Sequence, residues 1–297
     1  GAIMGSKNLK AIAVRGTHDV AVAKPDEFMS MVQEFQERMM GPATEKYTKL
    51  GTVEDLLVHN ALYCLPTRNY SNAHFENAEK ISGEAINTRY TAKVIACATC
   101  PMPCEHEVII PEGPFKGAMT RIEYESLWAL GPYCGVDRLD AIIKAVELCY
   151  YYGLDAQSVG VTVGFLMDCH EKGILTHEDL GDLDAHFGNV EVLLQLIEKI
   201  GKREGIGDKL ADGVKVAAEK IGKDSQQFAQ HIKGLEVTGY DLRCFKTAAL
   251  GFATSFSGAH GDSYAFDVRG KTDNYGKDRS KYVTQVNDIA AVFDSLM

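Results

Sequence analysis

The sequence predicts a mainly α-helical protein, and three observations support this. Apolar residues recur at helical spacing, as in residues 141–152. Residues typical of helix starts and stops flank such stretches: Pro25 opens one and Gly41 closes it. Only one stretch, residues 8–15, alternates and is rich in Ile and Val, as is typical of a strand. At 297 residues the chain is long enough for two domains or one large α-rich body.

The expected helices follow one another along the whole chain. Pro25 stands in a first turn and is followed by acidic residues, which the positive end of a helix dipole favours. Gly153 breaks one helix and Gly173 ends the next. We expect helices over residues 25–40, 53–60, 82–91, 123–130, 141–152, 158–172, 190–202, 208–221 and 280–297, and residues 246–254 form a short apolar stretch.

Composition and charge narrow the class of protein. The formal net charge of −10 argues against nucleic acid or an anionic membrane as the main partner. Eight cysteines do not make a disulfide framework at this length. The first residues carry no signal peptide, and no apolar run approaches the roughly 20 residues of a membrane span. We therefore expect a cytoplasmic protein, and the start at Gly1 without an initiator Met indicates a fragment.

Three cysteines that lie close together give the strongest functional signal. Cys97, Cys100 and Cys104 have the spacing C-x2-C-x3-C, in a loop that two prolines stiffen. This spacing resembles an iron–sulfur loop, in which thiolates hold the irons. Zinc is the first alternative, since Cys3His is a structural zinc set and His106 lies two residues on. A disulfide or unligated thiols are the remaining interpretations.

Several further motifs occur in the same order in one family. They are residues 1–12, the cysteine loop 97–104, residues 123–131 with Glu123-Tyr124-Glu125-Ser126, Tyr152-Gly153-Leu154-Asp155, and residues 251–254 followed by His260. Together they resemble the tungsten-dependent aldehyde:ferredoxin oxidoreductases. The resemblance covers essentially all 297 residues, and the order of the motifs is as specific as any one of them.

The resemblance implies an architecture and a set of cofactors. Residues 1–23 would be the end of an N-terminal β-rich, pterin-binding domain, and so a short β remnant. Residues 24–230 would form an α-helical domain 2 with the cluster loop, and residues 231–297 the start of an α-helical domain 3. The implied cofactors are a 4Fe–4S cluster, a tungsten (or molybdenum) bis-pterin, and magnesium bound through the pterin phosphates.

Two residues would then be catalytic, Glu125 and His260. An acid near the metal could move the proton that is released when an aldehyde is oxidised. The alternative for Glu125 is a helix-start acid, which the helix dipole favours. His260 lies in the glycine-containing loop 257–262, where the family's Arg-Gly-Cys-His is replaced by Ser-Gly-Ala-His.

Two aspartates would bind the pterins, Asp155 and Asp294. Asp155 ends a motif of the form Asp-x-x-Gly-Leu-Asp, although Tyr150 stands at its first position. A helix N-cap is the alternative or additional role of Asp155. Asp294 resembles the start of a second such motif, whose final cysteine would be the fourth cluster ligand beyond Met297. We interpret the other cysteines as small buried hydrophobes, and they are Cys64, Cys134, Cys149, Cys169 and Cys244.

The resemblance thus predicts an enzyme that oxidises aldehydes to carboxylic acids. Electrons would leave through the cluster to ferredoxin as the partner protein, and a homo-oligomer is compatible with the family. Two alternatives stay open. One is a related tungstoenzyme that reduces acids or aromatic rings; the other is an inactive fragment without cofactor, because three thiolates alone hold a cluster that is readily lost.

Overall fold

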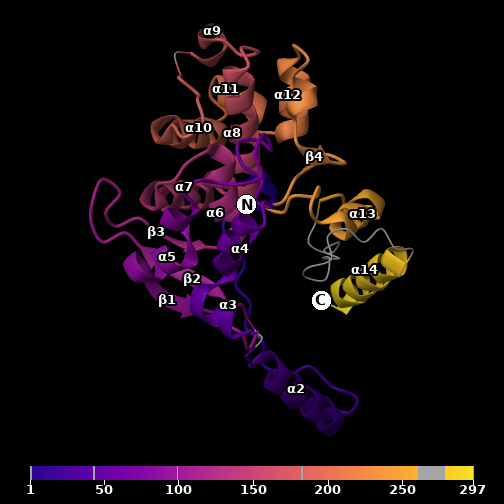
Figure 1. Ribbon diagram of the computed structural model, residues 1–297. Helices are drawn as coiled ribbons and strands as arrows, with labels where there is room; N and C mark the ends of the chain where they lie inside the picture. The colour runs from indigo at the N-terminus through magenta and orange to yellow at the C-terminus, as the bar shows by residue number, and fades with distance from the viewer. Residues whose placement is uncertain (1, 43, 99, 182, 260–277, 297) are drawn as a thin grey trace.

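A computed structural model describes residues 2–42, 44–98, 100–181, 183–259 and 278–296 of the chain (Figure 1). The α-helices are α1 (Ala2–Ser6), α2 (Pro25–Met39), α3 (Glu45–Leu50), α4 (Asp55–Ala61), α5 (Gly83–Arg89), α6 (Tyr124–Leu130), α7 (Leu139–Tyr152), α8 (Ala156–Glu171), α9 (His177–Leu180), α10 (Val190–Lys202), α11 (Ile206–Leu210), α12 (Val214–Ile221), α13 (Lys246–Thr254) and α14 (Asp278–Leu296). The strands are β1 (Thr91–Ile95), β2 (Glu105–Ile109), β3 (Met119–Ile122), β4 (His231–Ile232) and β5 (Leu235–Glu236). Short 3₁₀ turns cover Thr52–Glu54, Ala78–Ile81, Pro132–Cys134 and Ser225–Phe228.

The helical architecture confirms the predicted fold class. Most expected helices form close to their expected bounds, and α10 begins and ends as predicted. Residues 208–221 were expected as one helix but lie in two, α11 and α12. Gly213 separates them with a φ of +88°, a backbone conformation that ends a right-handed helix. No helix in the described part of the chain is long and apolar enough to cross a membrane.

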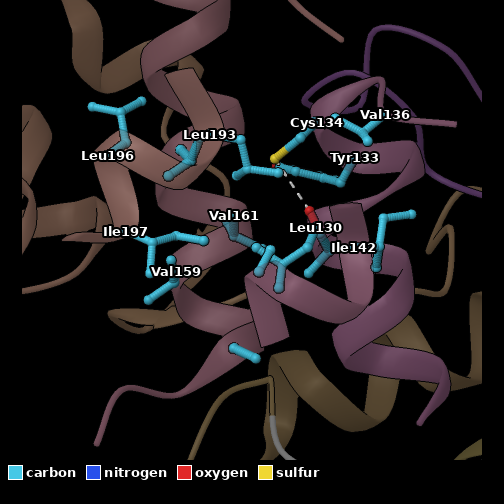
Figure 2. Close-up of a cluster of buried hydrophobic side chains, with 14 of the residues drawn as sticks. Leu130, Tyr133, Cys134, Val136, Ile142, Val159, Val161, Leu193, Leu196 and Ile197 are labelled. Atoms are coloured by element: carbon cyan, nitrogen blue, oxygen red, sulfur yellow. Dashed lines mark hydrogen bonds between the residues drawn. The ribbon is translucent and has the colours of Figure 1, made fainter. Parts of the chain in front are cut away.

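The core lies where α6, α7, α8 and α10 pack together. Leu127, Ile142, Val161 and Leu193, one from each of these helices, are fully buried. Figure 2 shows how side chains of these helices and of the turn after α6 meet around Cys134, whose thiol donates to the carbonyl oxygen of Ala129 at 3.2 Å. This burial removes a large apolar area from water and supplies the main stabilisation of the fold.

Two glycines one turn apart allow α6 to approach α8 closely. A Cβ atom at Gly160 would lie 2.5 Å from the backbone carbonyl carbon of Ala129 on α6. A Cβ atom at Gly164 would lie 2.6 Å from the ring of Tyr133. Neither position has room for a side chain, so α6 and the turn that follows it rest directly on the α8 backbone.

The cysteine loop lies in a small sheet that the sequence patterns did not reveal. Strands β1, β2 and β3 form an antiparallel sheet in that order, and residues 96–104 connect β1 to β2. Burial alternates along β2: His106 and Val108 are buried, and Glu105, Glu107 and Ile109 are more exposed. Each strand has only four or five residues, too few for an alternating pattern to stand out in the sequence.

The strand expected over residues 8–15 was a wrong prediction. These residues are exposed and adopt no regular structure. A strand needs a neighbour to pair its backbone N–H and C=O groups, and no described segment pairs with this one. α2 extends away from the body of the molecule (Figure 1) and buries none of its residues.

A left-handed backbone turn joins the core to the surface. Arg68, Asn69 and Tyr70 have φ values of 45°, 51° and 64°. Each such residue costs about 1–3 kcal/mol and persists only where its surroundings hold it. Asn69 is buried, and its side chain accepts a hydrogen bond from the Tyr133 hydroxyl at 2.7 Å and donates one to Asp168 at 3.0 Å. The core therefore stabilises the turn from within.

The close contact between α6 and α8 predicts a large effect of one methyl group. Gly160→Ala should lower the free energy of unfolding by about 1–3 kcal/mol, because the added carbon overlaps the α6 backbone. Gly16→Ala is the control, since a Cβ atom there would meet nothing within 4 Å. Urea unfolding of both variants measures the difference, and equal stabilities would contradict the tight contact.

Candidate active site and cysteine loop

Glu125 lies in the first turn of α6 but does not cap that helix. The N-cap is Glu123, whose side chain accepts from the backbone of the third helical residue. Ser126 completes this capping box, because its hydroxyl accepts from the Glu123 backbone N–H at 3.3 Å. The capping role is thus filled by Glu123, while Glu125 keeps a first-turn position that the helix dipole favours.

The Glu125 carboxylate binds a backbone amide far away in the sequence. Its Oε2 accepts a hydrogen bond from the N–H of Gly239 at 2.8 Å. Gly239 has no room for a side chain, since a Cβ atom would lie 2.7 Å from the Tyr124 ring and 3.0 Å from the Trp128 ring. The segment after β5 therefore passes directly over the start of α6, and its backbone meets the carboxylate.

Two tyrosine hydroxyls hold the same segment. Tyr124 donates to the carbonyl oxygen of Gly239, and His59 Nδ1 lies 3.0 Å from the Tyr124 hydroxyl. Tyr70 donates to the carbonyl oxygens of Thr238 at 3.3 Å and Tyr240 at 3.2 Å. Burial is the main cause that raises the pKa of both hydroxyls, so each keeps its proton and acts as a donor.

Sequence reasoning missed these partners of Glu125. His59 is buried against the rings of Tyr124, Tyr240 and Phe245. Histidine in a helical stretch carries no local signal of such a contact. Gly239 offered the only hint, as a glycine in a stretch without helical periodicity.

The three loop cysteines are unpaired and lie toward the surface. Cys97 is exposed, and Cys100 and Cys104 are half-buried. Burial raises the pKa of Cys104, and the charges of Glu123 and of the other two thiols raise it further. The thiols of Cys97 and Cys100 are thus near enough to Cys104 to affect its pKa. Within the described residues, however, no group of three or more His, Cys, Asp or Glu side chains is arranged to hold a metal ion.

A carboxyl pair adjoins the loop. Burial, together with a hydrogen bond to Glu105, raises the pKa of Glu123 to about 6. Glu105 also pairs with Arg121 at 3.1 Å across the β2–β3 ladder. The cysteine loop thus ends beside the N-cap of α6, which links it to the helix that carries Glu125.

His106 faces the core rather than joining the three thiols. It is buried on β2, its Nε2 has no hydrogen-bond partner among the described residues, and burial lowers its pKa. A Cβ atom at Gly51 would lie 3.3 Å from the His106 ring, so the ring packs against that glycine. This placement gives no support to a Cys3His zinc site that includes His106.

The other cysteines mostly behave as buried hydrophobes. Cys64, Cys134, Cys149 and Cys169 are buried, and burial raises the pKa of Cys149 and Cys169 to about 12. Cys244 is half-buried and interacts with Cys64, which the sequence spacing did not suggest.

The other predicted site residues are Asp155, His260 and Asp294. Asp155 is the N-cap of α8, where its Oδ1 accepts from the Ser158 N–H at 2.7 Å. This confirms the capping role, and the exposed side chain stays a candidate for pterin binding. His260 lies outside the described residues. Asp294 lies in α14, but its side chain is outside the description too.

Comparisons with known proteins now define the class. The family model for aldehyde ferredoxin oxidoreductase, domains 2 & 3, matches residues 30–297. A tungsten-containing aldehyde ferredoxin oxidoreductase of Thermococcus kodakarensis is 40% identical over 263 residues, which are 87% of this chain and 42% of the relative. One of Pyrococcus furiosus is 36% identical over 308 residues, covering 99% of this chain and 50% of the relative.

A solved structure agrees with these matches. The active-site complex of a benzoyl coenzyme A reductase bound to 1,5-dienoyl-CoA has a TM-score of 0.63 and 27% sequence identity, over 80% of this chain and 38% of that one. The chain therefore belongs to the aldehyde ferredoxin oxidoreductase family. It spans about half the length of the curated relatives it matches.

The donor chemistry of the loop fits an iron–sulfur cluster. Three thiols on one loop, none of them in a disulfide, are the ligand type that such clusters require. Irons would also offset the negative charge that the thiolates and Glu123 bring together.

The loop predicts bound iron and sulfide rather than zinc. Protein reconstituted without oxygen should show a broad brown absorbance that dithionite bleaches, and Cys100→Ser should lower the bound iron. Cys244→Ser, which changes a half-buried thiol outside the loop, is the control and should keep it. A colourless protein with one tightly bound zinc would show that the loop is a zinc site.

Proposed function

We propose that this chain forms part of an oxidoreductase that oxidises aldehydes to carboxylic acids at a tungsten–bis-pterin centre. Membership of the family supports the reaction class, and the curated relatives carry tungsten and aldehyde ferredoxin oxidoreductase in their names. The observation that carries the proposal is the Glu125 carboxylate, which a backbone amide holds away from its own helix cap.

In this proposal Glu125 handles the proton of the reaction. The hydrogen bond from Gly239 orients the Glu125 carboxylate, which would take up the proton released from the substrate. The pterin-bound metal supplies the two-electron acceptor when it is bound. Asp155 contributes a carboxylate that accepts from pterin N–H groups, and His260 is proposed as the second acid–base group.

The cysteine loop is the proposed exit for electrons. Cys97, Cys100 and Cys104 would hold a 4Fe–4S cluster that delivers electrons singly to ferredoxin. Their position toward the surface suits this role, because a protein acceptor needs close access to the donor.

A second function is favoured by two specific similarities. A protein named aliphatic sulfonate oxidoreductase, WOR-like subunit, of Pyrococcus furiosus is 30% identical over 92% of this chain and 45% of its own length. The solved benzoyl coenzyme A reductase noted above has the same fold. In this second proposal the same Glu125 would protonate a different substrate during its reduction.

Replacing Glu125 separates catalysis from structure. Glu125→Gln is nearly isosteric, so metal content should stay near the parent value while aldehyde-dependent dye reduction falls by about 10²–10⁴-fold. The control is Glu84→Gln, which changes an exposed glutamate in the first turn of α5 and should leave the rate unchanged.

The outcomes discriminate between the functions. Turnover of Glu125→Gln within a few-fold of the parent would show that Glu125 is not the acid–base group. A metal-loaded parent that is inactive on aldehydes but reduces an aromatic thioester would favour the second function. A parent that binds no metal under the same conditions would support a chain without cofactor.

A further inference from the structure

We propose that Tyr70 and Tyr124 are positioning residues for Glu125, which act by holding the backbone at Gly239. The inference rests on the proposed function, in which Glu125 moves the proton. Neither tyrosine needs to contact the substrate for this role. Each acts through a peptide group, and the three contacts involved lie on the described part of the chain.

One peptide group is held from both sides. The carbonyl oxygen of Thr238 accepts from the Tyr70 hydroxyl at 3.3 Å, and the hydroxyl shares its proton with the carbonyl oxygen of Tyr240 at 3.2 Å. The N–H of the peptide between Thr238 and Gly239 donates to Glu125 at 2.8 Å. Hydrogen bonds in such a chain polarise one another, so the bond from Tyr70 strengthens the N–H as a donor to the carboxylate.

The next peptide group is held by the second tyrosine. Tyr124 donates its hydroxyl proton to the carbonyl oxygen of Gly239. A hydroxyl has one proton and a carbonyl can only accept, so His59 Nδ1, 3.0 Å away, must donate to the Tyr124 oxygen. The Tyr124 hydroxyl is thereby fixed from its other side, and the two peptide planes around Gly239 have their orientation set.

The glycine makes this arrangement compact. Because the backbone at Gly239 lies against the rings of Tyr124 and Trp128, the segment cannot move toward α6. Tyr240 packs against His59 and Tyr124, with ring centroids at 5.0 and 5.3 Å. The tyrosine hydroxyls and the packed rings together orient the backbone so that the Gly239 N–H points toward the Glu125 carboxylate.

Such positioning matters because a glutamate has several side-chain rotamers. A carboxylate that is already fixed in its productive orientation loses less freedom on the way to the transition state. Removing one hydroxyl should therefore lower kcat while leaving substrate binding, and hence KM, nearly unchanged. A residue that only supports the fold would not produce this split.

Amide hydrogen exchange tests the arrangement without any cofactor. In the full chain, Tyr124→Phe and Tyr70→Phe should each speed exchange across residues 237–241 by about tenfold, the size expected when one hydrogen bond is lost. Ser225→Ala is the control: it also loses a buried hydroxyl-to-carbonyl bond, to Ala218 at 3.1 Å, but outside this contact. Exchange at residues 237–241 should be unchanged in the control.

Kinetics of the metal-loaded enzyme test the consequence. Tyr124→Phe should lower kcat by about 5- to 20-fold with KM within twofold of the parent, since a lost hydrogen bond is of that order. If the tyrosine acts through Glu125, the double variant Tyr124→Phe/Glu125→Gln should be no slower than Glu125→Gln alone. Ser225→Ala should keep the parent kcat.

The two experiments distinguish a failure of the proposed function from a failure of the positioning role. If the metal-loaded parent oxidises no aldehyde, the proposed function is wrong, and exchange alone decides the positioning: selective loss of protection supports it and retention overturns it. If the parent is active, faster exchange with an unchanged kcat overturns the inference. An additive loss in the double variant overturns it too, because it means that Tyr124 acts independently of Glu125.

Discussion

The contact between α6 and α8 is the constraint on which the rest of the structure depends. Gly160 and Gly164 present bare backbone, so α6 and Tyr133 can lie directly on α8. No larger residue at either place would permit this distance. The start of α6 carries Glu125, and the turn after its end carries Tyr133. The distance between α6 and α8 therefore sets the positions of both residues.

From Tyr133 a continuous set of contacts leads back to Glu125. The Tyr133 hydroxyl holds Asn69, which stabilises the left-handed turn that places Tyr70. Tyr70 in turn holds the backbone that binds Glu125. Buried hydrogen bonds in the core offset the conformational cost of that turn. The residues that hold the site in place are therefore themselves held by the core.

The fold class could be predicted from the sequence, and much of the site could not. Helical periodicity and breakers such as Gly153 are local, and they located most helices. The strand expected over residues 8–15 failed because alternation alone does not supply a pairing partner. The sheet around the cysteine loop was missed for the opposite reason, since its strands are short and each depends on its neighbour.

The same limit applies to the side chains of the site. Cys97, Cys100 and Cys104 share one loop, so their spacing revealed them. Glu125 was found through a resemblance, but its partner Gly239 is more than a hundred residues away, with a sequence separation of 114. Nothing local in the sequence connects the two.

The β2–β3 hairpin has a consequence for how this chain can vary in evolution. Cys104 directly precedes β2 and Glu123 directly follows β3, so the ladder sets the cysteine loop beside the start of α6. An inserted residue within either strand would turn every following side chain to the other face and carry His106 or Ile122 out of the core. The connecting turn is different, since Gly113 and Gly117 there have nothing within 4 Å of a Cβ position. We therefore expect changes of length near Gly113 to be tolerated better than changes within the two strands.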